Sequence, residues 1–138
     1  MQLTKNFALW EFIKSDKAKE LNINNTPNNE ELENIKFVAE QLQLIRNTYK
    51  MPINISSGYR CDELNKAVGG AINSYHKKGL AVDIQQGTRQ RNKNLFLLIK
   101  RMMQIGLPVE ELINEKDYTW IHIAFAKENP SFEVLKTY

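Results

Sequence analysis

Cysteine and histidine are both scarce in this 138-residue sequence, which contains one cysteine, Cys61, and two histidines, His76 and His122. A single cysteine excludes an internal disulfide bond and a metal site built from several thiolates, and it favours synthesis in a reducing compartment. We interpret Cys61 as a buried residue at a helix start rather than as a reactive thiol. The histidines stand in two short motifs, "NSYHKKGLAVDI" (73–84) and "TWIHIAF" (119–125).

Long apolar runs are also absent. No stretch approaches the roughly 20 apolar residues that a membrane-spanning helix needs. The first residues, "MQLTKNFALWEF", lack the basic start and apolar run of a signal peptide. We therefore expect a protein synthesised in the cytoplasm without a signal peptide and without membrane insertion, which reaches any target outside the cell by another route.

The net charge is small. The sequence contains 19 Lys and Arg residues and 16 Asp and Glu residues, which gives a net charge of +3. Nucleic-acid binding needs a concentrated basic patch, so we expect no nucleic-acid partner. The basic segment "TRQRNKN" (88–94) is interpreted as a solvated helix start, with attraction to an anionic polymer as the alternative. Repeats, low-complexity tracts and linkers are missing, which predicts a single domain over residues 1–138.

The pattern of apolar residues predicts helices followed by mostly antiparallel strands, the α+β class, without the alternation of a doubly wound sheet. The strongest periodicity follows a cap at Asn28 or Asn29 and places apolar residues at steps of three and four. These residues are Leu32, Ile35, Val38, Leu42, Ile45 and Tyr49. Further helices are predicted at 6–21, 61–68 and 88–106, strands at 52–56 and 79–85, a hairpin of 109–115 with 119–125, and an edge strand in 131–138.

Strand geometry indicates how the two histidine motifs can contribute side chains to one site. Side chains alternate between the two faces of a strand, so Asp83 shares a face with Ala81, and His122 shares one with Ala124. If the two strands are neighbours, Asp83 and His122 project from the same side of the sheet. His76, which precedes a turn at Gly79, can then fold over to meet them.

Two imidazoles and one carboxylate are suitable ligands for zinc, and three protein ligands leave a fourth position for water, as in catalytic sites. Zinc lowers the pKa of such a water to about 7 and thereby activates it as a nucleophile. Taken singly, a histidine on a strand is more often a hydrogen-bonded group, and an aspartate before a loop is more often a cap. The spacing of His76 and Asp83 is not specific enough to decide.

Three ordered motifs resemble a known family, the zinc D-alanyl-D-alanine carboxypeptidase family of murein peptidases. They are closest to its C-terminal-domain type, which is common in phages and prophages, and the similarity extends over essentially the whole chain. The family pattern is Ser-Gly-Tyr-Arg, then Ser-x-His-x-x-Gly-x-Ala-x-Asp, then Trp-x-His. In this sequence the pattern falls on Ser57, Gly58, Tyr59 and Arg60, on Ser74, His76, Gly79, Ala81 and Asp83, and on Trp120 and His122.

The resemblance implies the fold shared by these peptidases and the hedgehog signalling domain, a small antiparallel sheet with helices packed on one side. It also implies Zn²⁺ as cofactor, held by His76, Asp83 and His122. Arg60 would stabilise the negative charge of the tetrahedral adduct or bind a substrate carboxylate. Ser74 would bind substrate or fix the His76 loop.

A general acid/base is also required, and the family pattern places a glutamate at the end of the strand before the last zinc histidine. Glu115 is the preferred candidate and Asp117 the alternative, because the spacing from Glu115 to His122 is about one residue longer than usual. Tyr59 and Trp120 are interpreted either as walls of the substrate pocket or as core residues.

These expectations define two hypotheses. The first is a zinc metallopeptidase that hydrolyses a peptide bond in the peptidoglycan stem peptide, as a D-Ala-D-Ala carboxypeptidase or an L-Ala-D-Glu endopeptidase. It would act on the cell wall as a monomer, for example as a phage or prophage endolysin. The alternative is a non-catalytic, zinc-stabilised module that binds the cell wall or a phage structure.

Overall fold

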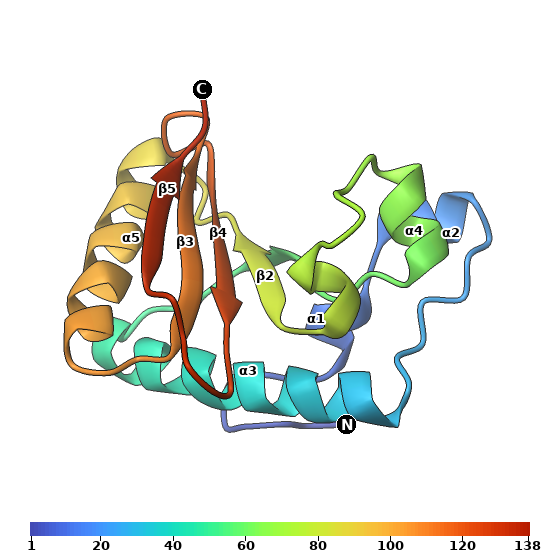
Figure 1. Ribbon diagram of the computed structural model, residues 1–138, viewed down its shortest axis with the longest axis horizontal. Coiled ribbons are helices and arrows are strands. Elements are labelled where there is room, and N and C mark those ends of the chain that lie inside the picture. The colour runs from blue at the N-terminus through green and yellow to red at the C-terminus, as the bar shows by residue number, and fades with distance from the viewer.

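A five-stranded sheet organises the computed structural model, which describes residues 1–138 (Figure 1). In spatial order the strands are β1 (Ile55–Ser57), β2 (Ala81–Ile84), β4 (Trp120–Phe125), β3 (Val109–Glu115) and β5 (Glu133–Lys136). The α+β class is confirmed, as are the hairpin of β3 with β4 and the edge strand near the C-terminus.

The sheet is mixed rather than wholly antiparallel, because β5 pairs parallel to β3. All other neighbours pair antiparallel. β2 already occupies the second edge of β4, so the chain leaving β4 cannot pair with β4 again and pairs with the free edge of β3 instead. Having reversed its direction after β4, the chain then runs the same way as β3.

Two long helices, α3 (Asn29–Tyr49) and α5 (Arg89–Gln104), contribute the helical side of the core. Asn28 is the cap of α3, and its side chain and that of Glu31 form a capping box. The main cluster of buried apolar side chains joins these helices to one face of the sheet. It includes Ile35, Val38, Leu42, Ile45, Leu95 and Ile99 from the helices and Val82, Ile84, Leu112, Ile121 and Ile123 from the strands.

The helix predicted over residues 6–21 is wrong as a single element, because it is divided into α1 (Trp10–Ile13) and α2 (Asp16–Glu20). Lys14 and Ser15 have extended backbones, and the Ser15 side chain accepts a hydrogen bond from the Ala18 N–H. A serine at this position starts a new helix more readily than it continues an old one. The break lets α1 pack against β1 while α2 lies beside α4 (Asp62–Ala67) (Figure 1).

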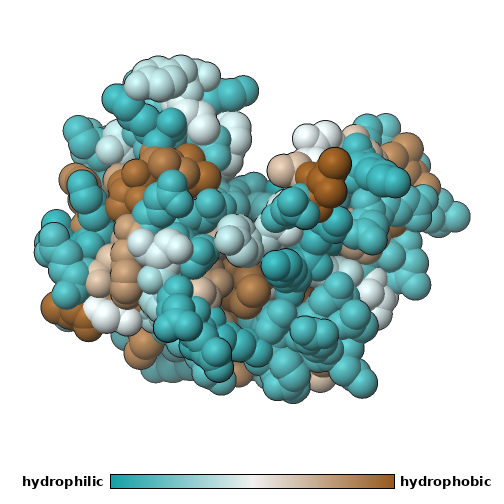
Figure 2. Space-filling view, in the orientation of Figure 1, coloured by the Kyte–Doolittle hydropathy of each residue, from teal (hydrophilic) through white to brown (hydrophobic).

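The face of the sheet opposite the core helices is partly open. Figure 2 shows a hollow on this side of the molecule, between the part that carries β3 to β5 and the part that carries α4. A short 3₁₀ helix, η1 (Tyr75–Lys78), lies beside β2 and α4. None of the helices has the length and apolar character needed to cross a membrane.

Candidate metal centre

Strand register brings the first two candidate ligands together. Asp83 in β2 is directly opposite His122 in β4, and Ile113 in β3 is opposite His122 on its other side. Directly opposite residues of an antiparallel pair project from the same face. The condition left open by the sequence is therefore met, since β2 and β4 are neighbours and Asp83 and His122 share a face.

The third candidate, His76, is carried by η1, whose two ends are fixed by local interactions. The Ser74 side chain accepts a hydrogen bond from the His76 N–H at the start of η1. Gly79 ends it with φ of 76°, and a Cβ there would lie 2.8 Å from the Glu31 carbonyl oxygen of α3. Glycine therefore permits both the left-handed backbone and the close approach that turns the chain into β2.

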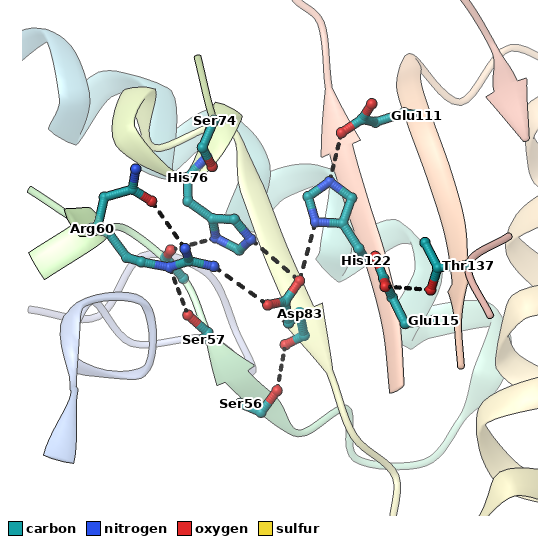
Figure 3. A network of polar contacts seen from close by, with 12 residues as sticks. Ser56, Ser57, Arg60, Ser74, His76, Asp83, Glu111, Glu115, His122 and Thr137 are labelled. Atoms are coloured by element: carbon teal, nitrogen blue, oxygen red, sulfur yellow. Dashed lines mark hydrogen bonds and ion pairs between the residues drawn. The ribbon is translucent and has the colours of Figure 1, made fainter. Parts of the chain in front are cut away.

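The three side chains converge on one point (Figure 3). Asp83 Oδ1 is 3.2 Å from His76 Nε2 and 3.1 Å from His122 Nδ1, and all three ligand atoms lie within 4.8 Å of one another. Ligands at the zinc distances of about 2.0–2.1 Å in a tetrahedron are separated by roughly 3.3 Å. The spacing and the chemistry of the donors thus fit a zinc ion.

Each histidine directs one ring nitrogen toward this point, and its other ring nitrogen is hydrogen-bonded to an oxygen atom. His76 Nδ1 is 2.7 Å from the Gly58 carbonyl oxygen, which can only accept a hydrogen bond. His122 Nε2 is 2.8 Å from the Glu111 carboxylate. His76 and His122 are 3% and 8% exposed, so these contacts hold both rings within a largely dry environment.

The charges of the site stabilise one another. Burial by itself raises the pKa of Asp83, but hydrogen bonds to His122 and His76 outweigh it and hold that pKa well below its usual range. Burial by itself lowers the pKa of His122, yet hydrogen bonds to Asp83 and Glu111 raise it to about 9. Without metal, His122 is therefore an imidazolium between two carboxylates at neutral pH.

Arg60 lies on the other side of Asp83 and is held by three contacts. Its Nη2 is 3.6 Å from Asp83 Oδ2, and its Nε donates to Ser57 Oγ over 3.3 Å. Its Nη1 donates to Asn65 Oδ1 over 3.0 Å, and Asn65 is itself only 3% exposed. Because Asp83 offers Oδ2 to Arg60, its Oδ1 remains directed at the two histidines. The side chain of Arg60 is only 14% exposed, so the cation is fixed beside the centre.

The two candidates for the general base have different positions. Glu115 is opposite Trp120, on the face that carries His122, and its carboxylate accepts a hydrogen bond of 2.8 Å from Thr137 Oγ (Figure 3). Asp117 is exposed in the turn after β3, where its backbone has φ of 53°. Glu115 therefore shares the face of His122, whereas Asp117 lies beyond the end of β3.

The remaining candidates border the centre in different ways. Tyr59 is 5% exposed and belongs to the core cluster, and its hydroxyl donates to Glu31 over 2.9 Å. Burial, followed by that hydrogen bond, raises the pKa of Tyr59 far above its usual range. Trp120 is half-buried, with Lys116 Nζ 5.7 Å from its ring centroid. Ser74 caps η1, which is one of the two roles expected for it.

Two residues of this network, Glu111 and Asn65, were not expected from the sequence. Glu111 has a detectable signal, since Glu111, Ile113 and Glu115 alternate along one predicted strand. Its contact with His122 additionally requires the hairpin register, which pairs Ile113 with His122 and Glu111 with Ala124. Asn65 carries no comparable signal, because its role depends on how α4 packs beside Arg60.

An α+β domain that brings two histidines and one carboxylate together beside a fixed arginine defines a candidate metallohydrolase. Comparison of the sequence with models of protein families supports this class, because a family model described as Peptidase M15 matches residues 5–124. The chain therefore belongs to the Peptidase M15 family, whose members are zinc peptidases. Among curated proteins, none matches this chain.

Proposed function

We propose that this protein is a zinc metallopeptidase that hydrolyses a peptide bond in the stem peptide of bacterial peptidoglycan. The observation that carries the proposal is the convergence of His76, Asp83 and His122 on one point, next to Arg60, within the region that matches the family. Three protein ligands are typical of catalytic zinc sites, whereas structural sites usually have four.

In this proposal, His76 Nε2, Asp83 Oδ1 and His122 Nδ1 hold the zinc ion. When bound, zinc supplies a Lewis acid that polarises a carbonyl group and lowers the pKa of a coordinated water. The ligands need no large rearrangement, because Asp83 Oδ1 already has the separation of a neighbouring tetrahedral ligand from both histidine nitrogens, and all three atoms lie within 4.8 Å of one another.

Arg60 contributes a fixed positive charge. Its three contacts leave two of its five N–H groups available for a substrate oxygen. It borders a cleft of about 370 Å³ that also reaches Ser57, Lys14 and Asp83. A carboxylate of the stem peptide, or the oxyanion that develops during attack, is the group that this charge stabilises best.

Glu115 is the proposed proton carrier. It would take the proton of the attacking water and return it to the leaving amine. Support comes from its position at the end of β3 on the face of His122, and from the Thr137 hydroxyl, which restrains its carboxylate. Trp120, directly opposite Glu115, and Ser74, beside His76, are proposed to contact the substrate, and Tyr59 is proposed to support the wall of the cleft near Arg60.

The test is to incubate purified peptidoglycan with the zinc-loaded protein and to identify the fragments by mass spectrometry. New termini at one stem-peptide bond are expected, and their position distinguishes D-Ala-D-Ala carboxypeptidase from L-Ala-D-Glu endopeptidase action. Asp83→Asn should abolish cleavage, whereas Glu128→Gln, a change of an exposed carboxylate, should not. Wall binding without any new terminus would refute the peptidase and establish the non-catalytic binding module instead.

The biological setting follows from the same proposal. A peptidase of this kind acts on the cell wall, and the motifs of the sequence suggest a phage or prophage endolysin. Lysis of bacteria whose membrane has been permeabilised, by the wild-type protein but not by Asp83→Asn, is the result expected of an endolysin.

A further inference from the structure

His122 contacts a carboxylate through each of its ring nitrogens. Nδ1 is 3.1 Å from Asp83 Oδ1, and Nε2 is 2.8 Å from Glu111 Oε1. The side chains of His122 and Glu111 are only 11% and 23% exposed. Figure 3 shows Glu111 and Asp83 on opposite sides of the imidazole ring. Asp83 is accounted for as a metal ligand, whereas Glu111 has no assigned role.

The sheet explains why Glu111 reaches the ring. The residue opposite His122 is Ile113, and Glu111 is opposite Ala124. Glu111 is therefore a diagonal neighbour of His122 on the same face, at a distance that a long side chain can span. Ala124 is fully buried and has only a methyl group, so it leaves the space between the two side chains free.

The chemistry of the acceptor determines the tautomer of the ring. An ionised carboxylate can only accept hydrogen bonds, so Nε2 of His122 must carry a hydrogen. When a metal ion displaces the second proton of the imidazolium and the ring is neutral, the lone pair is therefore on Nδ1, which faces the point where the ligands converge. His76 is fixed in the opposite sense, because the Gly58 carbonyl requires a hydrogen on Nδ1 and leaves the lone pair on Nε2.

We propose that Glu111 is a positioning residue of the metal centre, which holds His122 in the orientation and tautomer that present Nδ1 to the metal. The proposal depends on the zinc site of the proposed function, but not on peptidase activity. A carboxylate hydrogen-bonded behind a metal-binding histidine also makes the ring a stronger donor. Glu111 is not a ligand in this arrangement, because it contacts the nitrogen that points away from the other ligands.

The zinc affinity of variants tests the role. Glu111→Met keeps the length of the side chain and removes the acceptor, so we expect zinc to bind about 10- to 100-fold more weakly. Glu111→Gln retains an acceptor oxygen and should restore most of that affinity. The matched control is Glu110→Gln, since the neighbouring Glu110 binds the Ser131 backbone and hydroxyl instead. Its zinc affinity should equal that of the wild type.

Competition with a chromophoric chelator measures these affinities, and nitrogen NMR of the histidine rings reports the tautomers. In the zinc-loaded wild type, His122 should carry its hydrogen on Nε2 and His76 on Nδ1. Wild-type affinity in Glu111→Met, or a hydrogen on Nδ1 of His122, would overturn the role of Glu111. Failure of the wild type to bind zinc would overturn the metal site as well, whereas zinc binding without wall cleavage would overturn only the peptidase.

Discussion

Two carboxylates near the end of β3 differ in whether their positions suit a general base. Glu115 and Asp117 are two positions apart, yet Glu115 shares the face of His122 while Asp117 is exposed in a turn of left-handed residues. A general base must reach the water that it deprotonates, either directly or through one further water. Thr137 adds a restraint that Asp117 lacks, since its hydroxyl donates to Glu115.

Replacing Glu115 therefore tests the base. We expect Glu115→Gln to lower kcat by about 100- to 10,000-fold, because the proposed proton carrier is lost, while about one zinc per chain is retained. Asp117→Asn should change kcat less than about threefold, because Asp117 is exposed in the turn beyond β3 and makes no side-chain hydrogen bond that would direct it at the centre. Steady-state kinetics on a synthetic stem peptide and metal analysis measure both effects. A larger loss in Asp117→Asn than in Glu115→Gln would reverse the assignment.

Gly58 is a second residue whose identity is fixed by its surroundings. A Cβ at this position would lie 2.4 Å from the Phe12 carbonyl oxygen of α1. The Gly58 carbonyl in turn holds Nδ1 of His76. Any outward movement of this segment therefore displaces the support of His76, a proposed metal ligand.

We expect Gly58→Ala to lower the free energy of unfolding by about 2–3 kcal/mol, since overpacking forces the backbone to shift, and to weaken zinc binding. The control is Gly69→Ala, where the backbone has φ of 73° but nothing lies within 4 Å of the added Cβ. It should cost about 1–2 kcal/mol and leave zinc affinity unchanged. Urea denaturation and chelator competition measure the two quantities. Equal zinc affinities in both variants would show that the Gly58 carbonyl does not support His76.

At the scale of elements, one buried side chain joins α5 to the turn between β3 and β4 and to the segment that follows β2. Asn92 is fully buried, and its amide nitrogen lies 2.9 Å and 3.1 Å from the Tyr118 and Thr119 carbonyl oxygens of the hairpin turn. Its side-chain oxygen accepts from the Gln86 N–H over 2.7 Å, just beyond β2. The start of α5 thereby fixes the turn that follows Glu115.

We expect Asn92→Leu to lower the free energy of unfolding by about 2–4 kcal/mol, because leucine fills a similar volume but leaves buried backbone groups without partners. Asn94→Leu, at an exposed position of the same helix, should change it by less than about 0.5 kcal/mol. Chemical denaturation of the metal-free proteins makes the comparison. Similar stabilities for the two variants would mean that the amide contacts contribute little.

The elements also show what sequence could predict. Alternation along β2 and β4 correctly separated Asp83 and His122 from the apolar core face of each strand, but the pairing that joins the two residues was only a condition. The parallel direction of β5 was missed, since it depends on which sheet edge remains free. The break at Ser15 was also missed, because local capping competes with an apolar pattern that extends on both sides.

The contacts among distant residues were the least predictable part of the site. Glu111 contacts His122 only because the hairpin register pairs Ile113 with His122 and Glu111 with Ala124. Asn65 reaches Arg60 only because α4 packs beside the centre. Such contacts depend on the relative placement of elements, which no local pattern in the sequence specifies.

At the scale of the whole molecule, folding and the proposed metal binding favour opposite protonation states of His122. His122 has a pKa of about 9 in the metal-free fold, above its ordinary value of 6.5, because the hydrogen bonds to Asp83 and Glu111 outweigh the opposing effect of burial. A raised pKa in the folded state stabilises the fold fully below about pH 6.5, and this contribution is lost as pH rises through about 9. Zinc requires the opposite state, because a ligand nitrogen must release its proton.

Stability and zinc affinity should therefore respond to pH in opposite directions. Between pH 6.5 and 9, the metal-free protein should lose about 2–3 kcal/mol of stability from His122, while apparent zinc affinity rises by roughly tenfold per pH unit through the release of one proton. Denaturation of chelator-treated protein and chelator competition measure the two trends. His122→Gln should lack the first trend, which separates His122 from other titrating groups. A metal-free protein whose stability is unchanged from pH 6.5 to 9 would show that His122 is not held as an imidazolium between Asp83 and Glu111, and the tightening of zinc binding with pH would then lose its stated cause.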